Sequence, residues 1–123
     1  MGDITLAGYG IDWGKSLNNC IGDRNFHKKI LDMFLEDQCF SKAKDAYMSD
    51  DRKELFARMH ELKGISGNVA LDDLYGATVP LVELLRVDSE KCDKAEIDRL
   101  FAACEEAYDR ACEGVKLYIE NNY

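Results

Sequence analysis

The sequence predicts an all-α protein, an antiparallel up-and-down four-helix bundle with a short extra N-terminal helix. Three observations lead to this fold class. Apolar residues recur at spacings of three and four along most of the chain, which is typical of amphipathic helices. No segment shows the alternating pattern of a half-buried strand. The 123 residues include a single proline, so few positions interrupt a helix.

The N-terminal half contains a short helix and one longer helical stretch. Residues 1–10 have no distinct pattern. Asp12 is placed to cap a short helix that runs to about Cys20, and a turn over 21–23 follows it. A second helix starts at Asp23, and the segment 38–48 continues it with a bend. The apolar positions of the second helix are Phe26, Ile30, Met33 and Phe34.

The C-terminal half contains three further helical patterns. Asp51, followed three residues later by Glu54, fits a capping box and predicts the start of a helix that runs to about Gly67. Its inward stripe consists of Leu55, Met59, Leu62 and Ser66. After a turn over 68–72, the next stripe consists of Leu71, Leu74, Thr78, Leu81 and Leu85. A long helix from about Cys92 carries Ile97, Leu100, Phe101, Cys104, Tyr108, Ala111, Val115 and Ile119.

Composition and charge exclude several classes of protein. The net charge of −8 argues against a nucleic-acid partner, because binding of that kind depends on clustered Lys and Arg. No apolar run approaches the roughly 20 residues of a membrane helix, and the N-terminus lacks a signal-peptide layout. We therefore expect no membrane partner, a cytoplasmic location and one domain over 1–123. Five scattered cysteines without a CxxC pair are a weak disulfide or zinc signal.

One segment, 59–68, carries the residues that suggest chemistry. When its apolar stripe is turned inward on a helix, the residues that share the outward side are His60, Lys63, Gly64 and Gly67. A glycine inside a helix costs roughly 0.5 to 1 kcal/mol relative to alanine, so two on one outward face need a reason. We interpret them as clearance that lets another protein bring a reactive group to the imidazole of His60.

These residue types suit phosphoryl transfer. An exposed imidazole is available as a neutral nucleophile near pH 7. Lys63 lies one turn along the same face and supplies a mobile cation for a bound anion. Positioning and charge neutralisation do most of the work in phosphoryl transfer. His60 is therefore the candidate phosphoacceptor, and no cofactor is expected.

The segment also resembles a known family. His60-Glu61-Leu62-Lys63-Gly64, followed by Gly67-Asn68, is similar to the HxLKG…GN signature of histidine-containing phosphotransfer (HPt) domains. The likeness extends over about 10–120, through the opening segment 11–13 and the helix 26–34. It implies a phosphocarrier of a two-component phosphorelay, not an autonomous enzyme, which takes a phosphoryl group from one receiver-domain aspartate and passes it to another.

The resemblance also implies roles and partners. His60 matches the phosphorylated residue, Lys63 the residue that steadies the phosphoryl group, and Gly64 the space-making glycine. The expected partners are response-regulator receiver domains and a hybrid sensor kinase, met by a monomer. The metal ion in such reactions belongs to the receiver, so no metal is expected here.

Two positions depart from the family pattern. Some members carry a Gln or Glu on the neighbouring helix that hydrogen-bonds the active imidazole, whereas the matching position here is Val82, with Glu83 beside it. Pro80 also lies inside that helix, where it removes a hydrogen bond to the carbonyl of Gly76. These departures concern the surroundings of His60 and not its identity.

Partner docking is expected around Phe56, Gly64 and Gly67. Phe56 lies one turn before His60 but also borders the core stripe, so core packing is its alternative role. Ile65, on the opposite flank, is a weaker candidate. The second histidine, His27, has bulky neighbours at i+3 and i+4 and is expected to be a plain surface residue.

Other classes of helical protein share single features with this sequence. The phosphoacceptor and dimerisation helices of a sensor histidine kinase also begin with His-Glu-Leu-basic, but a proline is expected soon afterwards, where Ile65 and Ser66 stand here. A helical adaptor without chemistry is favoured if His60 never becomes phosphorylated. A di-metal bundle needs Glu-x-x-His pairs, and the residues three before each histidine are Ala57 and Arg24.

Overall fold

The computed structural model describes residues 8–88 and 91–123, and the regular secondary structure of these ranges is entirely helical. The all-α fold class is therefore confirmed. Residues 1–7 of the N-terminal segment lie outside the described residues. The helices are α2 (Trp13–Asn19), α3 (Arg24–Glu36), α4 (Cys39–Met48), α5 (Arg52–Val69), α6 (Asp72–Asp88) and α7 (Lys94–Asn122).

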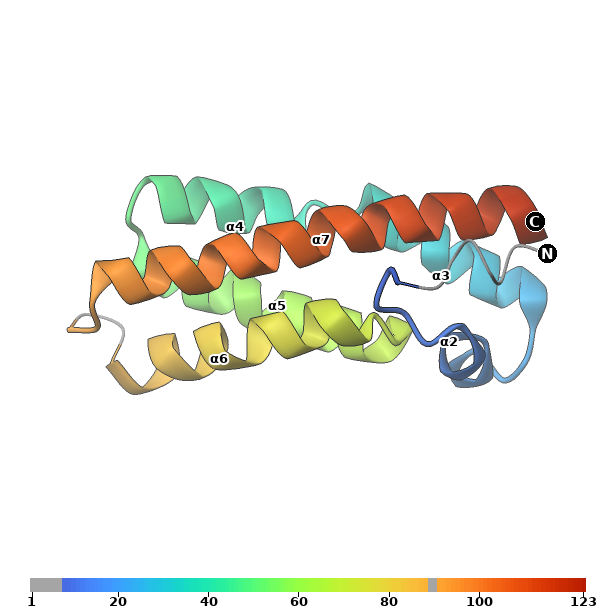
Figure 1. Cartoon of the computed structure of the whole chain (residues 1–123), viewed down its shortest axis with the longest axis horizontal. Helices are drawn as coiled ribbons and strands as arrows, with labels where there is room; N and C mark the ends of the chain where they lie inside the picture. The colour runs from blue at the N-terminus through green and yellow to red at the C-terminus, as the bar shows by residue number, and fades with distance from the viewer. Residues whose placement is uncertain (1–7, 89–90) are drawn as a thin grey trace.

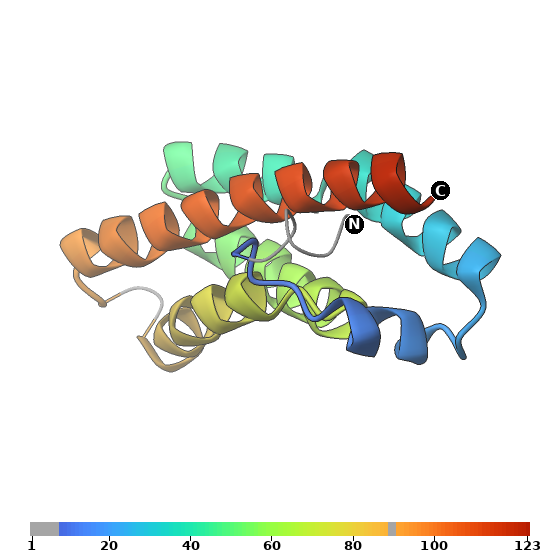
Figure 2. The ribbon, with the colours of Figure 1, turned by 45° about the vertical axis from the view of Figure 1, so that its right-hand side comes forward.

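The longest helix, α7, runs along the length of the molecule and packs against both α3 and α6 (Figure 1). Helix α5 packs between α4 and α6. The short α2 lies at the end of the molecule where α7 finishes, next to the first turns of α3 (Figure 2). Within the described ranges, none of these helices is long and apolar enough to cross a membrane.

Aspartates begin the first helices, because their carboxylates accept hydrogen bonds from the free amides of a first turn. Asp12 accepts from the backbone N–H of Lys15 at 3.0 Å, as predicted. Asp37 is extended and its carboxylate accepts from the N–H of Cys39 at 2.7 Å, which starts a new helix. The predicted bend between α3 and α4 is therefore a break.

Helix α5, which carries the candidate site, has well-defined ends. Asp51 caps it by accepting from the N–H of Glu54 at 3.1 Å, as the capping box predicts. The helix continues past Gly67 to Val69 and stops at Ala70, whose φ of 60° is left-handed. The carbonyl of Ala70 accepts a hydrogen bond from the N–H of Asp12 at 3.0 Å. This bond ties the N-terminal segment to the end of α5.

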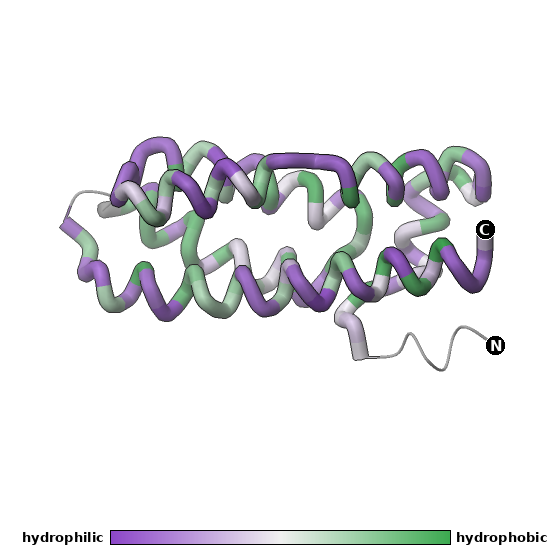
Figure 3. The backbone as a smooth tube through the Cα atoms, turned by 90° about the horizontal axis from the view of Figure 1, so that it is seen from above, coloured by the Kyte–Doolittle hydropathy of each residue, from purple (hydrophilic) through white to green (hydrophobic). Residues whose placement is uncertain are grey.

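The core follows the predicted stripes of α5 and α6, whose members are all buried. Stacked aromatic rings fill the space between α4 and α7, with Phe40 against Tyr108 at 4.3 Å and Tyr47 against Phe101 at 4.2 Å between centroids. Hydrophobic and hydrophilic positions alternate along the helices in the manner of amphipathic segments (Figure 3). The core thus fixes which side of α5 faces outward.

The expected inward stripe of α3 was partly wrong. Phe26 and Met33 are exposed, at 44% and 58%, although Phe34 is buried. The buried residues of this helix are His27, Leu31 and Phe34. An apolar row therefore remains on the surface of α3.

Candidate functional site

His60 lies on α5 on the side opposite the buried stripe, and its side chain is exposed. The ring of half-buried Phe56, one turn earlier, stacks on its imidazole with a centroid distance of 5.9 Å and an interplanar angle of 20°. Among the described residues no group hydrogen-bonds the imidazole. The ring is therefore oriented by an aromatic neighbour and open to solvent.

Lys63 is half-buried and lies on the same side of α5, as predicted. Its ammonium forms no ion pair with any residue of the described ranges. The nearby carboxylate of Glu61 accepts a hydrogen bond from Arg58 at 2.8 Å, so an arginine already balances its charge. Lys63 is left as a cation that can neutralise an added anion.

The two glycines of the motif have different surroundings. A Cβ atom on Gly64 would meet nothing within 4 Å outside its own helix, which agrees with the predicted clearance. A Cβ on Gly67 would lie 3.3 Å from ring carbons Cδ2 and Cε2 of Tyr75. Gly67 therefore makes room for a side chain of α6, whereas the sequence analysis interpreted both glycines as clearance for a partner.

These residues line one shallow pocket of about 300 Å³. Its walls are formed by His60, Lys63, Gly64, Gly67, Asn68 and Tyr75. None of the six is acidic, although 24 of the 123 residues are Asp or Glu. The pocket therefore suits an anionic group better than most of this surface does.

The α6 side of the pocket is not formed by the residues that the sequence singled out. Val82 is 1% exposed and belongs to the core, and exposed Glu83 lies 3.9 Å from Arg86. Pro80 is exposed, and α6 continues through it as one helix. The residue of α6 that reaches the pocket is Tyr75, seven residues before Val82 and hence on nearly the same side of the helix. The seven-residue spacing between Tyr75 and Val82 was the signal in the sequence that could have identified Tyr75.

The second histidine is not a surface residue, and the prediction for His27 was wrong. Its side chain is 0% exposed. Nε2 lies 2.8 Å from the hydroxyl of Ser16, and Nδ1 lies 2.7 Å from the hydroxyl of Tyr123. Both ring nitrogens are therefore engaged, which leaves His60 as the accessible histidine of the two that the chain contains.

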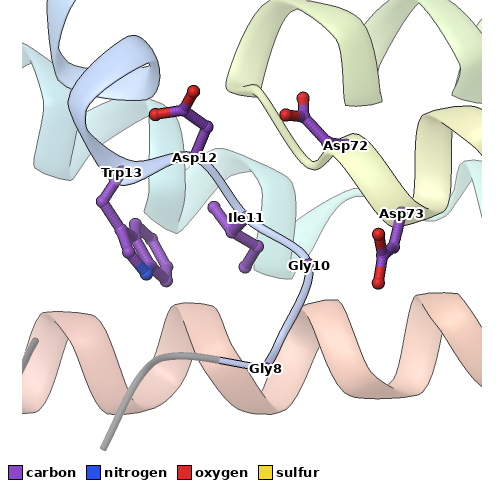
Figure 4. A pocket seen from close by; sticks show the side chains of 7 residues that line it. All are labelled: Gly8, Gly10, Ile11, Asp12, Trp13, Asp72 and Asp73. Atoms are coloured by element: carbon purple, nitrogen blue, oxygen red, sulfur yellow. The ribbon is translucent and has the colours of Figure 1, made fainter. Parts of the chain in front are cut away.

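A larger hollow, of about 560 Å³, lies elsewhere, between the segment 8–13 and the start of α6 (Figure 4). Two of its carboxylates already serve the fold. Asp12 caps α2, and Asp72 pairs with Lys15 at 3.0 Å. The indole of Trp13 stacks on Tyr118 with centroids 4.1 Å apart.

An apolar hollow of about 250 Å³ lies on the other flank of α5, against α3. Ile30 and Met33 line it from α3, and Ile65 lines it from α5. Asn68 lines both this hollow and the His60 pocket, so the two are neighbours.

Over residues 8–88 and 91–123, no three His, Cys, Asp or Glu side chains gather as a set able to hold a metal ion.

Comparison with known proteins gives one family match. The family model described as Hpt domain matches residues 29–114, which is more than half of the sequence and includes His60. Searches of curated proteins and of solved structures found no match.

Proposed function

The chain belongs to the Hpt domain family, and on that premise we propose that His60 accepts a phosphoryl group from a receiver-domain aspartate and passes it to another. The resemblance noted in residues 60–68 is thus confirmed by the family match. Hpt domains act in histidine phosphotransfer within phosphorelays and interact with receiver domains. For this chain, the acceptor residue and the direction of transfer are our proposal.

The observation that carries the proposal is the contrast between the two histidines. His27 is buried with both ring nitrogens hydrogen-bonded, whereas His60 is exposed beside the open backbone of Gly64. A phosphoryl donor is a protein that must approach within bonding distance of a ring nitrogen. Only His60 offers that access.

The proposed reaction follows from these groups. A neutral ring nitrogen of His60 attacks the phosphorus of the aspartyl phosphate, a nitrogen–phosphorus bond forms, and the bond to the aspartate oxygen breaks. The aspartate leaves as a carboxylate, and the proton on the other ring nitrogen can pass to water because the ring is exposed. Lys63 steadies the added negative charge, and Phe56 holds the ring from one side. The reverse sequence returns the group to a second aspartate.

The apolar row of α3 supplies the proposed main docking face. Phe26, Ile30 and Met33 follow one another at helical spacing, and the hollow between Met33 and Ile65 adjoins the His60 pocket. Contiguous exposed apolar surface beside a reactive group is typical of a protein interaction site. Gly64 lies between the two flanks of α5, and half-buried Phe56, the other docking residue expected from the sequence, lies on the flank opposite Ile65.

We also propose that α3 and α4 together count as the first helix of an up-and-down four-helix bundle, whose other three helices are α5, α6 and α7. Helix α2 is then the short extra helix. A single monomeric domain over 1–123 remains a prediction, which sedimentation of the purified chain tests.

The deciding experiment is phosphoryl transfer from labelled receiver domains to the wild-type chain and to His60→Gln. We expect acid-labile label on the wild type and none on the variant, with equal helicity because His60 lies off the core. His27→Gln, assayed at low temperature to keep it folded, should accept label. Label that persists on His60→Gln would overturn the assignment, and a wild type that no receiver labels would favour an adaptor without chemistry.

A further inference from the structure

Two large apolar side chains are exposed on α6 next to the His60 pocket. Tyr75 is 40% exposed and Val79 is 36% exposed. Four residues separate them, so they are neighbours on one side of the helix. We call this pair the α6 ridge. The core does not account for it, since the buried side of α6 is formed by the predicted stripe together with Val82.

The ring of Tyr75 rests with one edge against the helix beside it. Its carbons Cδ2 and Cε2 lie against Gly67, so closely that a Cβ there would be 3.3 Å away. A side chain that is already fixed loses little conformational entropy when a partner binds. Tyrosine also has only two side-chain torsions to order. Tyr75 therefore has the properties of a preorganised contact residue.

The hydroxyl of Tyr75 is available to a partner. It makes no hydrogen bond with any residue in the described parts of the chain. Two other tyrosines have partners: Tyr47 donates to Asp98 at 2.6 Å, and the hydroxyl of Tyr123 lies 2.7 Å from His27. The free hydroxyl points to an external acceptor as its partner.

The charge of the pocket indicates which kind of partner fits. Tyr75 lines it together with Lys63, and no wall residue carries a carboxylate. The donor in the proposed reaction presents an aspartyl phosphate, an anion, and this pocket lies directly beside His60. Continuity with the His60 site therefore favours the same receiver domain as the occupant.

We propose that the α6 ridge is a second contact surface for the receiver domain docked over His60, and that it contributes to the choice of receiver. This inference rests on the proposed function. The docked domain then contacts both flanks of α5, the apolar row of α3 on one side and the ridge on the other. The phenol donates a hydrogen bond to a carbonyl or carboxylate of the receiver, while the ring and Val79 pack against apolar groups.

The test uses purified receiver domains, phosphorylated with acetyl phosphate and chosen because they label the wild-type chain. Steady-state transfer is measured for Tyr75→Phe, Tyr75→Ala and Val79→Ala. The matched control is Val87→Ala, since Val87 lies on the same helix and is 74% exposed, away from the pocket. We expect Tyr75→Ala to raise KM roughly fivefold to tenfold with kcat unchanged, which is the effect of losing an interface anchor. Tyr75→Phe and Val79→Ala should raise KM by less, and Val87→Ala should not change it.

A second variant tests the same idea without removing the tyrosine. Gly67→Ala places a methyl group 3.3 Å from the ring, which must shift by a few tenths of an ångström, so KM should rise, but by less than for Tyr75→Ala. Thermal melting checks that each variant is folded. Unchanged KM in both Tyr75→Ala and Val79→Ala would overturn the ridge proposal and leave the proposed function intact. A fall in kcat at constant KM would also overturn it, since Tyr75 would then act in the chemical step. A wild type that no receiver labels refutes the proposed function itself.

Discussion

The Nδ1 atom of His27 lies 2.7 Å from the phenolic oxygen of Tyr123, and this contact joins α3 to the end of α7. The other ring nitrogen lies 2.8 Å from the hydroxyl of Ser16 in α2. A neutral imidazole has one donor and one acceptor nitrogen, and a hydroxyl group can complement either. His27 is thus a junction of three helices at the end of the bundle distant from the α4–α5 turn.

Replacement of this residue by His27→Gln should lower the free energy of unfolding by roughly 1 to 3 kcal/mol. The reason is that at least one buried hydroxyl partner is left without its hydrogen bond. Urea unfolding followed by circular dichroism measures the change. His60→Gln is the control and should unfold like the wild type, because His60 is exposed. Equal stability of the two variants would contradict a structural role for His27.

Acidification should destabilise the wild type before the carboxylates titrate. Burial, with a smaller contribution from the charge of Arg24, lowers the pKa of His27 below its ordinary value. The unfolded chain then binds a proton near pH 6.5 while the folded chain does not, so stability falls as pH drops below about 6.5. Unfolding midpoints compared at pH 7.5 and pH 5.5 should differ more for the wild type than for His27→Gln. Parallel pH profiles would count against this account.

Phe56 should contribute both to the fold and to the reaction, because it packs on the core and also on His60. Phe56→Leu keeps an apolar side chain in the half-buried position but removes the ring, and aromatic pairs are worth roughly 0.5 to 1.5 kcal/mol beyond their burial. We expect a small loss of stability and a several-fold fall in kcat for phosphotransfer. Phe56→Ala should add a larger fall in melting temperature. Normal transfer by Phe56→Leu would limit the residue to packing.

A larger side chain at position 64 should preserve the stability of the fold but slow phosphotransfer. Gly64→Ala meets no neighbour within 4 Å, so the better helix former should raise the free energy of unfolding by roughly 0.5 to 1 kcal/mol. Gly64→Leu should be equal to or more stable than the wild type, yet transfer phosphoryl groups far more slowly. The two variants form a size series at one position. Transfer that does not decrease with side-chain size would remove clearance as the explanation for this glycine.

The turn between α2 and α3 contains a residue in an unfavourable conformation. Ile21 has a φ of 60° and is 91% exposed, so a β-branched side chain occupies the left-handed region without compensating packing. Ile21→Asn should stabilise the fold by about 1 kcal/mol, since asparagine tolerates this region better. The melting temperature should rise by a few degrees. Ile21→Val keeps the branch and should melt like the wild type.

Much of the fold could be predicted from periodicity because the α5 and α6 stripes bring consecutive turns onto one buried side. The helix α3 was also predicted, but the side of it that is buried could not be. Its sequence offers two helical rows, Phe26-Ile30-Met33 and His27-Leu31-Phe34, and hydropathy favours the first. The structure buries the second, since His27 finds partners 11 and 96 residues away in the chain. Local pattern contains no information about such partners.

The candidate site was likewise predictable only where its residues share one helix. His60, Lys63 and Gly64 lie on one face of a single helix, so a helical projection was sufficient to group them. Tyr75 was missed because its contact with Gly67 depends on how α5 and α6 pack against each other. Val82, which was matched to the family pattern by position alone, faces the core.

The length of α7 has a consequence for partner choice. The helix spans 29 residues, about 44 Å at 1.5 Å per residue, and packs against both α3 and α6. Those two helices carry the two surfaces proposed to contact a receiver. The packing of α7 therefore affects the distance between these surfaces. A change of side-chain volume along the buried side of α7 would increase or decrease that distance. Partner discrimination would then depend partly on the buried side chains of α7.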